Sequence, residues 1–288
     1  MSRLSEIEKK QHAVETMVEL TSVFEGIASM KIAKIKNQVL TATQFFHDLW
    51  AIYTQLRVDS LFRFGRADDS VDVIDKELYI IITAEGGFSG DIDQKLISKM
   101  LETYDPKKQD ILVIGHHGAV QLAQKGIAFK KYFKLPEKDQ NINVTPIIQY
   151  VQKYKSTAVY YQQYISLMAQ DIKRIELSTA VTEIGKKAEE KEDVISEANY
   201  IFEPSTYAVV GYLERSMLHI AMSQLILDSK LAQYASRFKA MSAAHQAADD
   251  SLGEVKLGYS RAKRSLKDER LKEIVNGLKK VQMVGGDK

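Results

Sequence analysis

All four prolines of this 288-residue chain lie between residues 106 and 204, so both ends of the chain are long stretches without this helix breaker. Residues 1–64 contain one glycine, Gly26, and residues 205–282 contain four scattered ones. Two such stretches around a middle that is rich in breakers indicate a helix, a domain and a second helix. We therefore expect an α/β fold with three parts: a long helix over 1–64, a small central α/β domain over 76–204 and a long helix over 205–282.

Apolar side chains recur along both terminal stretches at alternating steps of three and four residues, which is the heptad pattern of helices that wind around each other. Because a helix of about 55 residues, about 80 Å long, cannot bury such a seam alone, we expect the two helices to form an antiparallel coiled coil. The N-terminal seam runs Ile7, Gln11, Val14, Val18, Thr21, Glu25, Ala28, Ile32, Ile35, Val39, Ala42, Phe46, Leu49, Tyr53 and Leu56. The C-terminal seam runs Leu213, Met217, Ile220, Gln224, Leu227, Leu231, Tyr234, Phe238, Met241, His245, Ala248, Leu252, Val255, Tyr259, Ala262 and Leu266.

The seams show helices that pair, and several classes of protein have such helices. One interpretation is a coiled-coil adaptor or dimerisation protein with an α/β sensor domain, which would form a stable homodimer. The polar His245 within the second seam is expected to set the register of the pair rather than to bind a ligand.

The middle of the chain alternates between strand and helix patterns. Residues 77–83 and 110–115 are short apolar runs, and residues 93–104 between them have a helical pattern. This is a βαβ unit, which implies parallel strands with a right-handed crossover, so we expect a Rossmann-like α/β domain. Further strands are expected at 128–133, 158–164 and 172–177, and the charged run at 185–193 is expected to be a solvated loop.

Composition excludes several functions. With 40 basic and 38 acidic residues the net charge is only +2, which argues against a dedicated nucleic-acid binder. The chain has no cysteine, so disulfides, thiolate zinc sites and cysteine catalysis are excluded. The first residues are charged at once, without the apolar core of a secretory signal, and no apolar run approaches the roughly 20 residues that span a bilayer. If the protein works at a membrane, we therefore expect another subunit to hold it there.

The glycine-rich segment 86–90 follows the first strand, where a phosphate-binding loop would lie. It continues into Asp91 and lacks the Gly-Lys-Ser/Thr ending of such loops, so we expect a tight strand-to-helix turn. A nucleotide-binding enzyme built on the central domain stays as an alternative, and it would show nucleotide affinity in the isolated chain.

Other polar groups were weighed for chemistry. His116 and His117 follow the second strand, and we expect a polar loop there rather than a catalytic base or a metal site. The acidic run at 189–193 is expected to be a solvated loop rather than a cation site. We therefore expect no catalytic residue, no metal and no cofactor.

Motifs along the C-terminal stretch resemble one known family. Residues 237–244 read Arg-Phe-Lys-Ala-Met-Ser-Ala-Ala, similar to R-M-x-A-M-x-A-A. Without a gap, Leu257, Tyr259 and Ala262 match L-x-Y-N-K-A, and Leu271, Glu273, Ile274, Val275 and Gly277 match E-L-x-E-I-V-x-G. Near the N-terminus, Leu20, Thr21, Ile27, Ala28, Lys31 and Lys34 align with K-I-T-x-A-M-x-M-V-A-A-x-K-x-x-K. These are motifs of the gamma subunits of F-type ATP synthases, so the chain resembles that family.

The chain also departs from the family pattern. Ala84 and Glu85 stand where the family has Asp-Arg before its glycine turn, and Lys263 and Arg264 stand where it has Arg-Gln. The chain therefore resembles a divergent member, whose contacts to its partners are adapted.

The resemblance implies a non-catalytic rotor shaft that turns inside a ring of alternating alpha and beta subunits, where it couples rotation to ATP synthesis or hydrolysis. The implied partners are those alpha and beta subunits, an epsilon-type subunit and the membrane c-ring, with no nucleic acid. The implied place is peripheral to a membrane, on the cytoplasmic side of a bacterial plasma membrane or the matrix side of an organelle's inner membrane, in a proton- or sodium-translocating F-type ATPase. A gamma-like shaft of an F-type ATPase that is not coupled to ion transport is a variant of this interpretation.

We expect the subunit contacts to include cationic side chains on both helices and the apolar end of the second helix. The candidate interface residues are Lys31, Lys34, Arg237, Met241, Tyr259, Arg261, Lys263, Arg264, Leu271, Ile274 and Val275.

Overall fold

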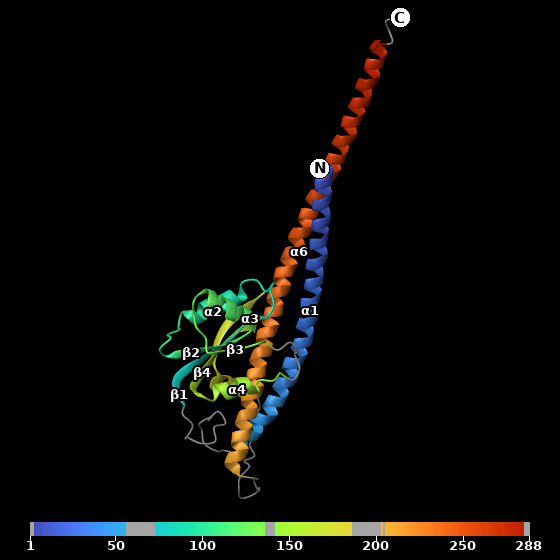
Figure 1. Ribbon diagram of the computed structural model, residues 1–288. Coiled ribbons are helices and arrows are strands. Elements are labelled where there is room, and N and C mark those ends of the chain that lie inside the picture. The colour runs from blue at the N-terminus through green and yellow to red at the C-terminus, as the bar shows by residue number, and fades with distance from the viewer. Residues whose placement is uncertain (1–2, 56–72, 136–141, 186–202, 204, 285–288) are drawn as a thin grey trace. The chain divides into compact units, whose positions relative to one another are not determined.

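The computed structural model describes residues 3–55, 73–135, 142–185, 203 and 205–284 (Figure 1). The chain divides into two compact units, Met1–Gly26 with Met241–Lys288, called the helical unit below, and Ile27–Ala240, called the mixed unit. Among the described residues, no helix is both long enough and apolar enough to cross a membrane. The elements in chain order are α1 (Arg3–Gln55), β1 (Ile74–Ile82), α2 (Ile92–Leu101), β2 (Gln109–Ile114), α3 (His116–Gln124), β3 (Lys131–Phe133), α4 (Thr145–Val151), β4 (Tyr154–Tyr164), β5 (Gln170–Glu176), α5 (Leu177–Gly185) and α6 (Thr206–Val284).

The two long helices are the 53-residue α1 and the 79-residue α6. Wherever the side chain is described, every position of the two expected seams is buried or half-buried, and none is exposed. Ala42 and Leu56 are the two seam positions whose side chains lie outside the described set. The heptad pattern therefore marks the contact faces of both helices.

Within the helical unit the pairing of α1 with α6 is antiparallel. Leu4 and Ile7, at the start of α1, line a groove of about 470 Å³ together with Gly258, Ala262 and Leu266 of α6. Further along α1, Val18 and Thr21 lie beside His245. Contacts thus move backward along α6 as α1 advances, as expected for an antiparallel coiled coil.

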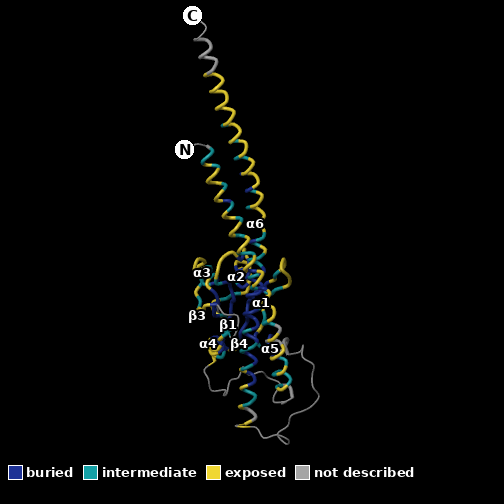
Figure 2. The backbone as a smooth tube through the Cα atoms, turned by 90° about the vertical axis from the view of Figure 1, so that its right-hand side faces the viewer, coloured by how far each residue is buried: buried dark blue, intermediate teal, exposed yellow. Residues whose placement is uncertain are grey.

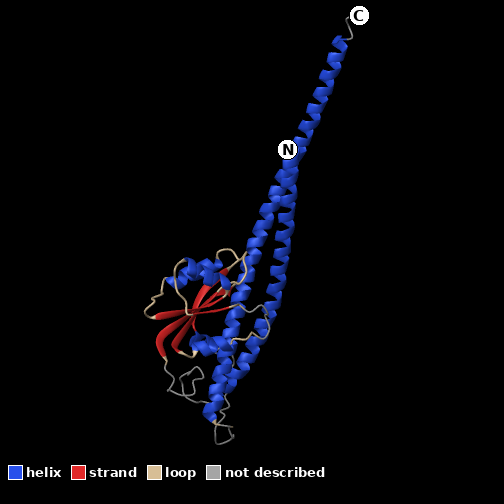
Figure 3. Ribbon diagram, in the orientation of Figure 1, coloured by secondary structure: helices blue, strands red, loops and turns tan. Residues whose placement is uncertain are grey.

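The mixed unit contains one five-stranded sheet with the order β3-β2-β1-β4-β5 (Figure 3). β1 pairs in parallel with β2 on one side and with β4 on the other, so that Ile80 lies opposite Leu112 and Val159. β3 is parallel to β2, and β5 is antiparallel to β4. The expected two long helices and the βαβ unit with parallel strands are confirmed. The sheet is mixed because the edge strand β5 is antiparallel, which was not predicted.

Side chains alternate across the sheet and bury two separate cores. Ile80 and Ile82 point to one face, against α4, α5, Phe46 of α1 and the first half of α6. Tyr79 and Ile81 point to the other face, against α2 and α3. This period of two places apolar residues on both faces, which is why the strands read as continuous apolar runs. Figure 2 shows this buried part of α6 in dark blue, whereas residues 267–277 further along α6 are exposed.

Several expected boundaries differ from the structure. The third strand was expected from 128 and begins at Lys131, and the fourth was expected from 158 and begins at Tyr154. Helices α4 and α5 were not predicted, because they span only seven and nine residues and Pro146 was read as a breaker although it lies in the first turn of α4. The charged run that was expected as a loop begins at Gly185, the last residue of α5, and its remainder lies outside the described residues.

The expected domain limits at 64, 76, 204 and 205 stay predictions. Positions 64 and 204 lie outside the described residues, while β1 begins at Ile74 and α6 at Thr206.

Candidate functional site

The outer faces of the helical unit carry most of the candidate interface residues. Arg261, Lys263 and Arg264 are exposed along α6, and the Lys263 ammonium lies 5.7 Å from the centre of the half-buried Tyr259 ring. Met241 is buried in the seam, with 7% of its surface exposed. The seam thus packs Met241 inward and leaves the three cations in solvent.

The last turns of α6 present apolar side chains to solvent. Leu271, Ile274 and Val275 are exposed by 59%, 60% and 48%. Figure 1 shows that, within the helical unit, α6 continues past the first residues of α1. Spacings of three and four residues place these side chains on one stripe of the helix. This stripe is an exposed apolar surface on α6.

Three candidate residues lie in the mixed unit. Lys34 is exposed on α1 and Lys31 is half-buried. Arg237 of α6 instead has partners within the chain: its Nε donates to the Gly87 carbonyl at 3.0 Å and one terminal nitrogen donates to the Gly86 carbonyl at 3.2 Å. The Arg237 guanidinium also lies 5.2 Å from the centre of the Tyr234 ring. Arg237 therefore fastens the glycine turn to α6.

The glycine turn lies at the point where the sheet reverses its strand order. β1 is followed by α2 on one face of the sheet, whereas α4 on the other face leads into β4. In Rossmann-like folds the crevice beyond the carboxyl ends of these two strands is the usual ligand site. Here the crevice is filled by side chains of the chain itself, among them Gln162 of β4 and Ser229 and Gln233 of α6, which are 0%, 0% and 4% exposed.

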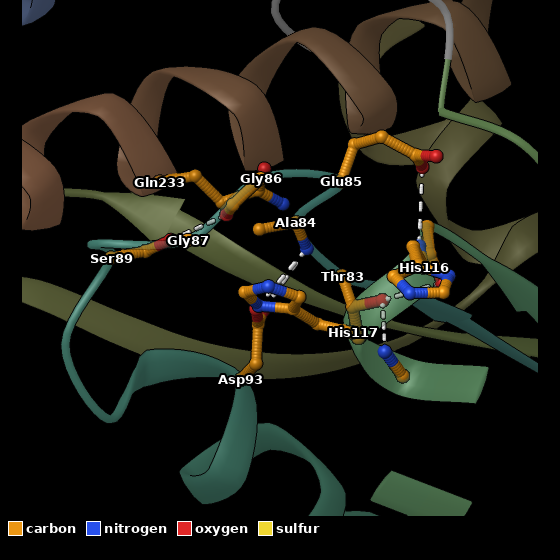
Figure 4. A network of polar contacts seen from close by, with 12 residues as sticks. Thr83, Ala84, Glu85, Gly86, Gly87, Ser89, Asp93, His116, His117 and Gln233 are labelled. Carbon is orange, nitrogen blue, oxygen red and sulfur yellow. Dashed lines mark hydrogen bonds and ion pairs between the residues drawn. The ribbon is translucent and has the colours of Figure 1, made fainter. Parts of the chain in front are cut away.

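Asp93, in the first turn of α2, is the buried charge of this crevice, with 3% of its surface exposed. Its carboxylate accepts hydrogen bonds from the backbone N–H of Ala84 at 3.2 Å and from Nε2 of Gln162 at 2.8 Å. Nδ1 of His117 lies 3.1 Å from the same carboxylate (Figure 4). Burial raises the pKa of Asp93, and the donors around it oppose that rise.

The two histidines open α3 and do not form the polar loop that was expected. Gly115 has a φ of 100°, which lets the chain turn directly from β2 into the helix. The first N–H groups of α3 are then satisfied within the fold, since His116 donates to Glu85 at 3.1 Å, His117 to the Ala84 carbonyl at 3.0 Å and Gly118 to the Thr83 hydroxyl at 2.9 Å (Figure 4). These bonds satisfy backbone N–H groups at the start of α3, which have no acceptor within the helix itself.

This arrangement opposes phosphate binding at the start of α3. An anion site needs free N–H groups at a helix N-terminus. The N–H groups at the start of α3 already donate to acceptors of the chain, and Glu85 and Asp93 add negative charge to the same region. The carbonyl oxygens of the glycine turn accept hydrogen bonds from α6. Together with the buried polar residues of the crevice, these contacts form a polar junction within the chain. The structure therefore disfavours the nucleotide-binding alternative.

Sequence reasoning missed the members of this junction. Asp93, Gln162, Ser229 and Gln233 match no motif, and they meet only because β4 lies beside β1 and beneath α6. One weak signal was present: Ser229 and Gln233 stand four residues apart, so they share one face of α6.

Comparisons with known proteins agree along the whole chain. A family model described as ATP synthase matches residues 3–281. The chain is 24% identical over 302 residues to the ATP synthase gamma chain of Chlorobium phaeobacteroides, which covers 98% of this chain and 99% of that one. It is 23% identical over 289 residues to the ATP synthase gamma chain of Pelotomaculum thermopropionicum, with 96% and 98% covered.

Solved structures share the fold. A chain in the structure of the Euglena gracilis mitochondrial ATP synthase, described as OSCP/F1/c-ring, has a TM-score of 0.65 at 14% identity, with 99% of this chain and 97% of that chain covered. A chain in the Tetrahymena thermophila mitochondrial ATP synthase central stalk and c-ring has a TM-score of 0.56 at 16% identity, with 78% and 99% covered. The family match, the full-length relatives and the two long helices around a central sheet agree. The chain therefore belongs to the ATP synthase family, as a divergent gamma subunit, the non-catalytic central rotor shaft of an F-type ATP synthase.

Proposed function

We propose that the helical unit turns inside a ring of alternating alpha and beta subunits and carries rotation to their catalytic sites. The observation that carries this proposal is the exposed apolar stripe of Leu271, Ile274 and Val275 on the last turns of α6. Exposed apolar patches mark contacts with other chains. An apolar tip makes no strong charge–charge contacts with the wall of the ring, so no single rotation angle is strongly favoured.

The cations of the helical unit have a second role in this proposal. Arg261, Lys263 and Arg264 are exposed and meet acidic groups of the beta subunits. Exposed charge pairs contribute little affinity, but they orient the partners. Because the coiled coil is asymmetric, each beta subunit meets a different face, and the differential contacts favour a different conformation in each.

The mixed unit contacts the remaining partners in this proposal. An epsilon-type subunit and the membrane c-ring bind outside the ring. Lys31 and Lys34 of this unit join the cations that meet acidic groups of the beta subunits, and Arg237, with Met241 and Tyr259 of the helical unit, supports the neighbouring contacts. The chain then lies peripheral to a membrane, on the cytoplasmic side in a bacterium or the matrix side in an organelle, and takes part in ion transport through its partners. The Euglena and Tetrahymena structures support these assignments, since both contain a c-ring.

Co-purification tests the assembly. The full-length chain is expressed with the alpha- and beta-type subunits of its source, and native mass spectrometry measures the stoichiometry. One copy of this chain per three alpha and three beta subunits is expected. A free homodimer that ignores these subunits would overturn the proposal and favour the adaptor interpretation.

Charge neutralisation tests the cations. In the assembled complex, Lys263→Gln combined with Arg264→Gln is expected to lower the ATP-driven torque and the coupling of hydrolysis to rotation. Lys107→Gln with Lys108→Gln is the matched control, because it removes two exposed charges from the mixed unit. Equal torque in both double variants would contradict the electrostatic role.

A further inference from the structure

The crevice beyond the carboxyl ends of β1 and β4, where the strand order reverses, is occupied by part of α6. A Rossmann-like protein would hold a ligand in this place. Ser229 and Gln233 lie one turn apart on the face of α6 that meets the sheet, and both are buried. Ser229 Oγ donates to Oε1 of Gln162, and Gln233 Nε2 lies 3.2 Å from the same oxygen. The Gln162 side chain therefore touches the shaft on one side and the α/β domain on the other.

The chemistry of the neighbours sets the direction of the Gln162 amide. An ionised Asp93 can only accept, so the amide nitrogen of Gln162 faces it, at 2.8 Å. The amide oxygen then faces α6 and accepts from both Ser229 and Gln233. Gln233 also donates to the Ser229 hydroxyl at 3.1 Å, so each polar group of this cluster has a partner. Reversing the amide would set the Gln162 nitrogen against the Gln233 nitrogen and leave Asp93 facing an oxygen.

The contacts around this cluster continue along the same turns of α6. The Ser236 hydroxyl donates to the Ser89 carbonyl at 2.7 Å, and Arg237 reaches the carbonyls of Gly86 and Gly87. Lys239 donates to the Met168 carbonyl at 3.3 Å. Those peripheral bonds are exposed or half-buried, whereas the Gln162 cluster is closed to solvent. In a low-dielectric site a satisfied polar network is more rigid and more directional than exposed bonds.

We propose that Gln162 is a positioning residue that couples the α/β domain to the rotor helix, because its amide links the buried carboxylate of Asp93 to Ser229 and Gln233 of α6. The consequence for torque rests on the proposed function, whereas the linkage itself does not. In this proposal the cluster carries part of the torque between α6 and the sheet, beside the apolar contacts that α6 makes with the same sheet.

An exchange of carboxylate and amide tests the linkage. Gln162→Glu alone places two carboxylates against each other in a buried site and is expected to raise the unfolding equilibrium constant about a hundredfold or more. In the double variant Asp93→Asn with Gln162→Glu, the new carboxylate accepts from Asn at 93 and still accepts from both α6 donors. We expect this double variant to regain about tenfold or more of that loss.

Unfolding is followed through the single tryptophan, Trp50, which packs against the core of the mixed unit. Gln94→Glu is the matched control, because it makes the same change one residue from Asp93 at an exposed position. It is expected to leave the unfolding midpoint nearly unchanged. If Asp93→Asn fails to rescue Gln162→Glu, or if Gln162→Met unfolds like the unmodified chain, Gln162 only fills space and the proposal is overturned.

Rotation of the assembled complex tests the mechanical consequence. Since the chain has no cysteine, Lys107→Cys provides its single thiol for attaching a bead to the α/β domain. In Gln162→Met we expect the ring to hydrolyse ATP at the usual rate while the torque on the bead falls. Asp93→Asn with Gln162→Glu is expected to restore that torque. Unchanged torque in Gln162→Met overturns the coupling role.

The two proposals fail in different ways. If the Lys107→Cys chain with no other change does not assemble with the ring or does not rotate, the proposed function fails. The exchange experiment on the full chain alone would still decide the linkage.

Discussion

Nδ1 of His245 lies 3.2 Å from the carbonyl oxygen of Val18, so an imidazole on α6 reaches the backbone of α1 across the seam of the helical unit. The Thr21 hydroxyl lies 3.3 Å from the same nitrogen. A polar residue in an apolar seam favours the one register in which its partner is present. The contact across the seam supports the expectation that His245 sets the register, which stays a prediction.

Removing this imidazole should loosen the helical unit. For His245→Ala we expect a loss of about 1 kcal/mol in local stability, the typical value of one hydrogen bond. Hydrogen exchange at the backbone amides of residues 14–25 measures it. Gln246→Ala is the control, because this exposed side chain donates to Asp250 of its own helix. Equal exchange rates in the two variants would show that the imidazole does not hold the pair.

We expect Arg237 to stabilise the mixed unit through the geometry of its hydrogen bonds and not through its charge alone. Because its planar fork reaches the carbonyls of both Gly86 and Gly87, Arg237→Ala is expected to destabilise the mixed unit by about 1–2 kcal/mol. Arg237→Lys keeps the charge but loses the paired geometry, so it should recover less than half of the loss. Urea unfolding followed by Trp50 fluorescence measures the unfolding free energy of both variants. Full recovery by lysine would indicate that charge alone matters at this position.

Gly115 is expected to tolerate no side chain. A Cβ there would lie 2.1 Å from the carbonyl oxygen of Thr83, and the φ of 100° adds backbone strain. We expect Gly115→Ala to destabilise the mixed unit by more than about 4 kcal/mol. Gly126→Ala is the control, since its φ of 68° is also positive but no atom lies within 4 Å, so it should cost about 1–2 kcal/mol. Soluble yield and the urea midpoint measure both, and similar midpoints would contradict the close approach.

Stability should depend on pH through Asp93. Burial raises the pKa of this carboxyl above its ordinary value of 3.8, so the folded chain binds its proton more tightly than the unfolded chain does. Between 3.8 and the raised pKa, the contribution of Asp93 to stability therefore falls as the pH rises, and above that window it stays constant. Relative to Asp93→Asn, the chain should lose unfolding free energy across the window in urea titrations.

Asp75 supplies a control of opposite sign for the pH experiment. A hydrogen bond from Lys155, together with its charge, lowers the pKa of the exposed Asp75. Its contribution is present above 3.8 and is lost as the pH falls through the lowered pKa. Relative to Asp75→Asn, the unfolding free energy of the chain should therefore rise with pH in this range, opposite to the change expected for Asp93. A slope of the same sign for both residues would contradict the assignment of the Asp93 shift to burial.

The sequence predicted the two long helices and their contact faces down to single residues. Leu252 and Val255 are buried, as their heptad positions require, and Arg261 and Lys263 between the seam positions are exposed. Heptad spacing is a local property, because residues three and four apart share a helix face whatever the helix packs against. The strands at 77–83 and 110–115 were predicted for a similar reason, since each is a short apolar run. The interface role of the candidate residues stays a prediction.

Only the tertiary structure decided how α6 is joined to the sheet. Gln162, Ser229 and Asp93 come from a strand and two helices that are distant in sequence, and no spacing rule relates them. They meet because β4 pairs with β1 at the point where the strand order reverses and because α6 covers that point. The amino-acid sequence by itself thus determined two long helices that pair, with a small α/β domain between them in the chain, since periodicity acts over a few residues. The contacts between α6 and the α/β domain depend on strand order and on buried hydrogen bonds, which exist only once the sheet has formed.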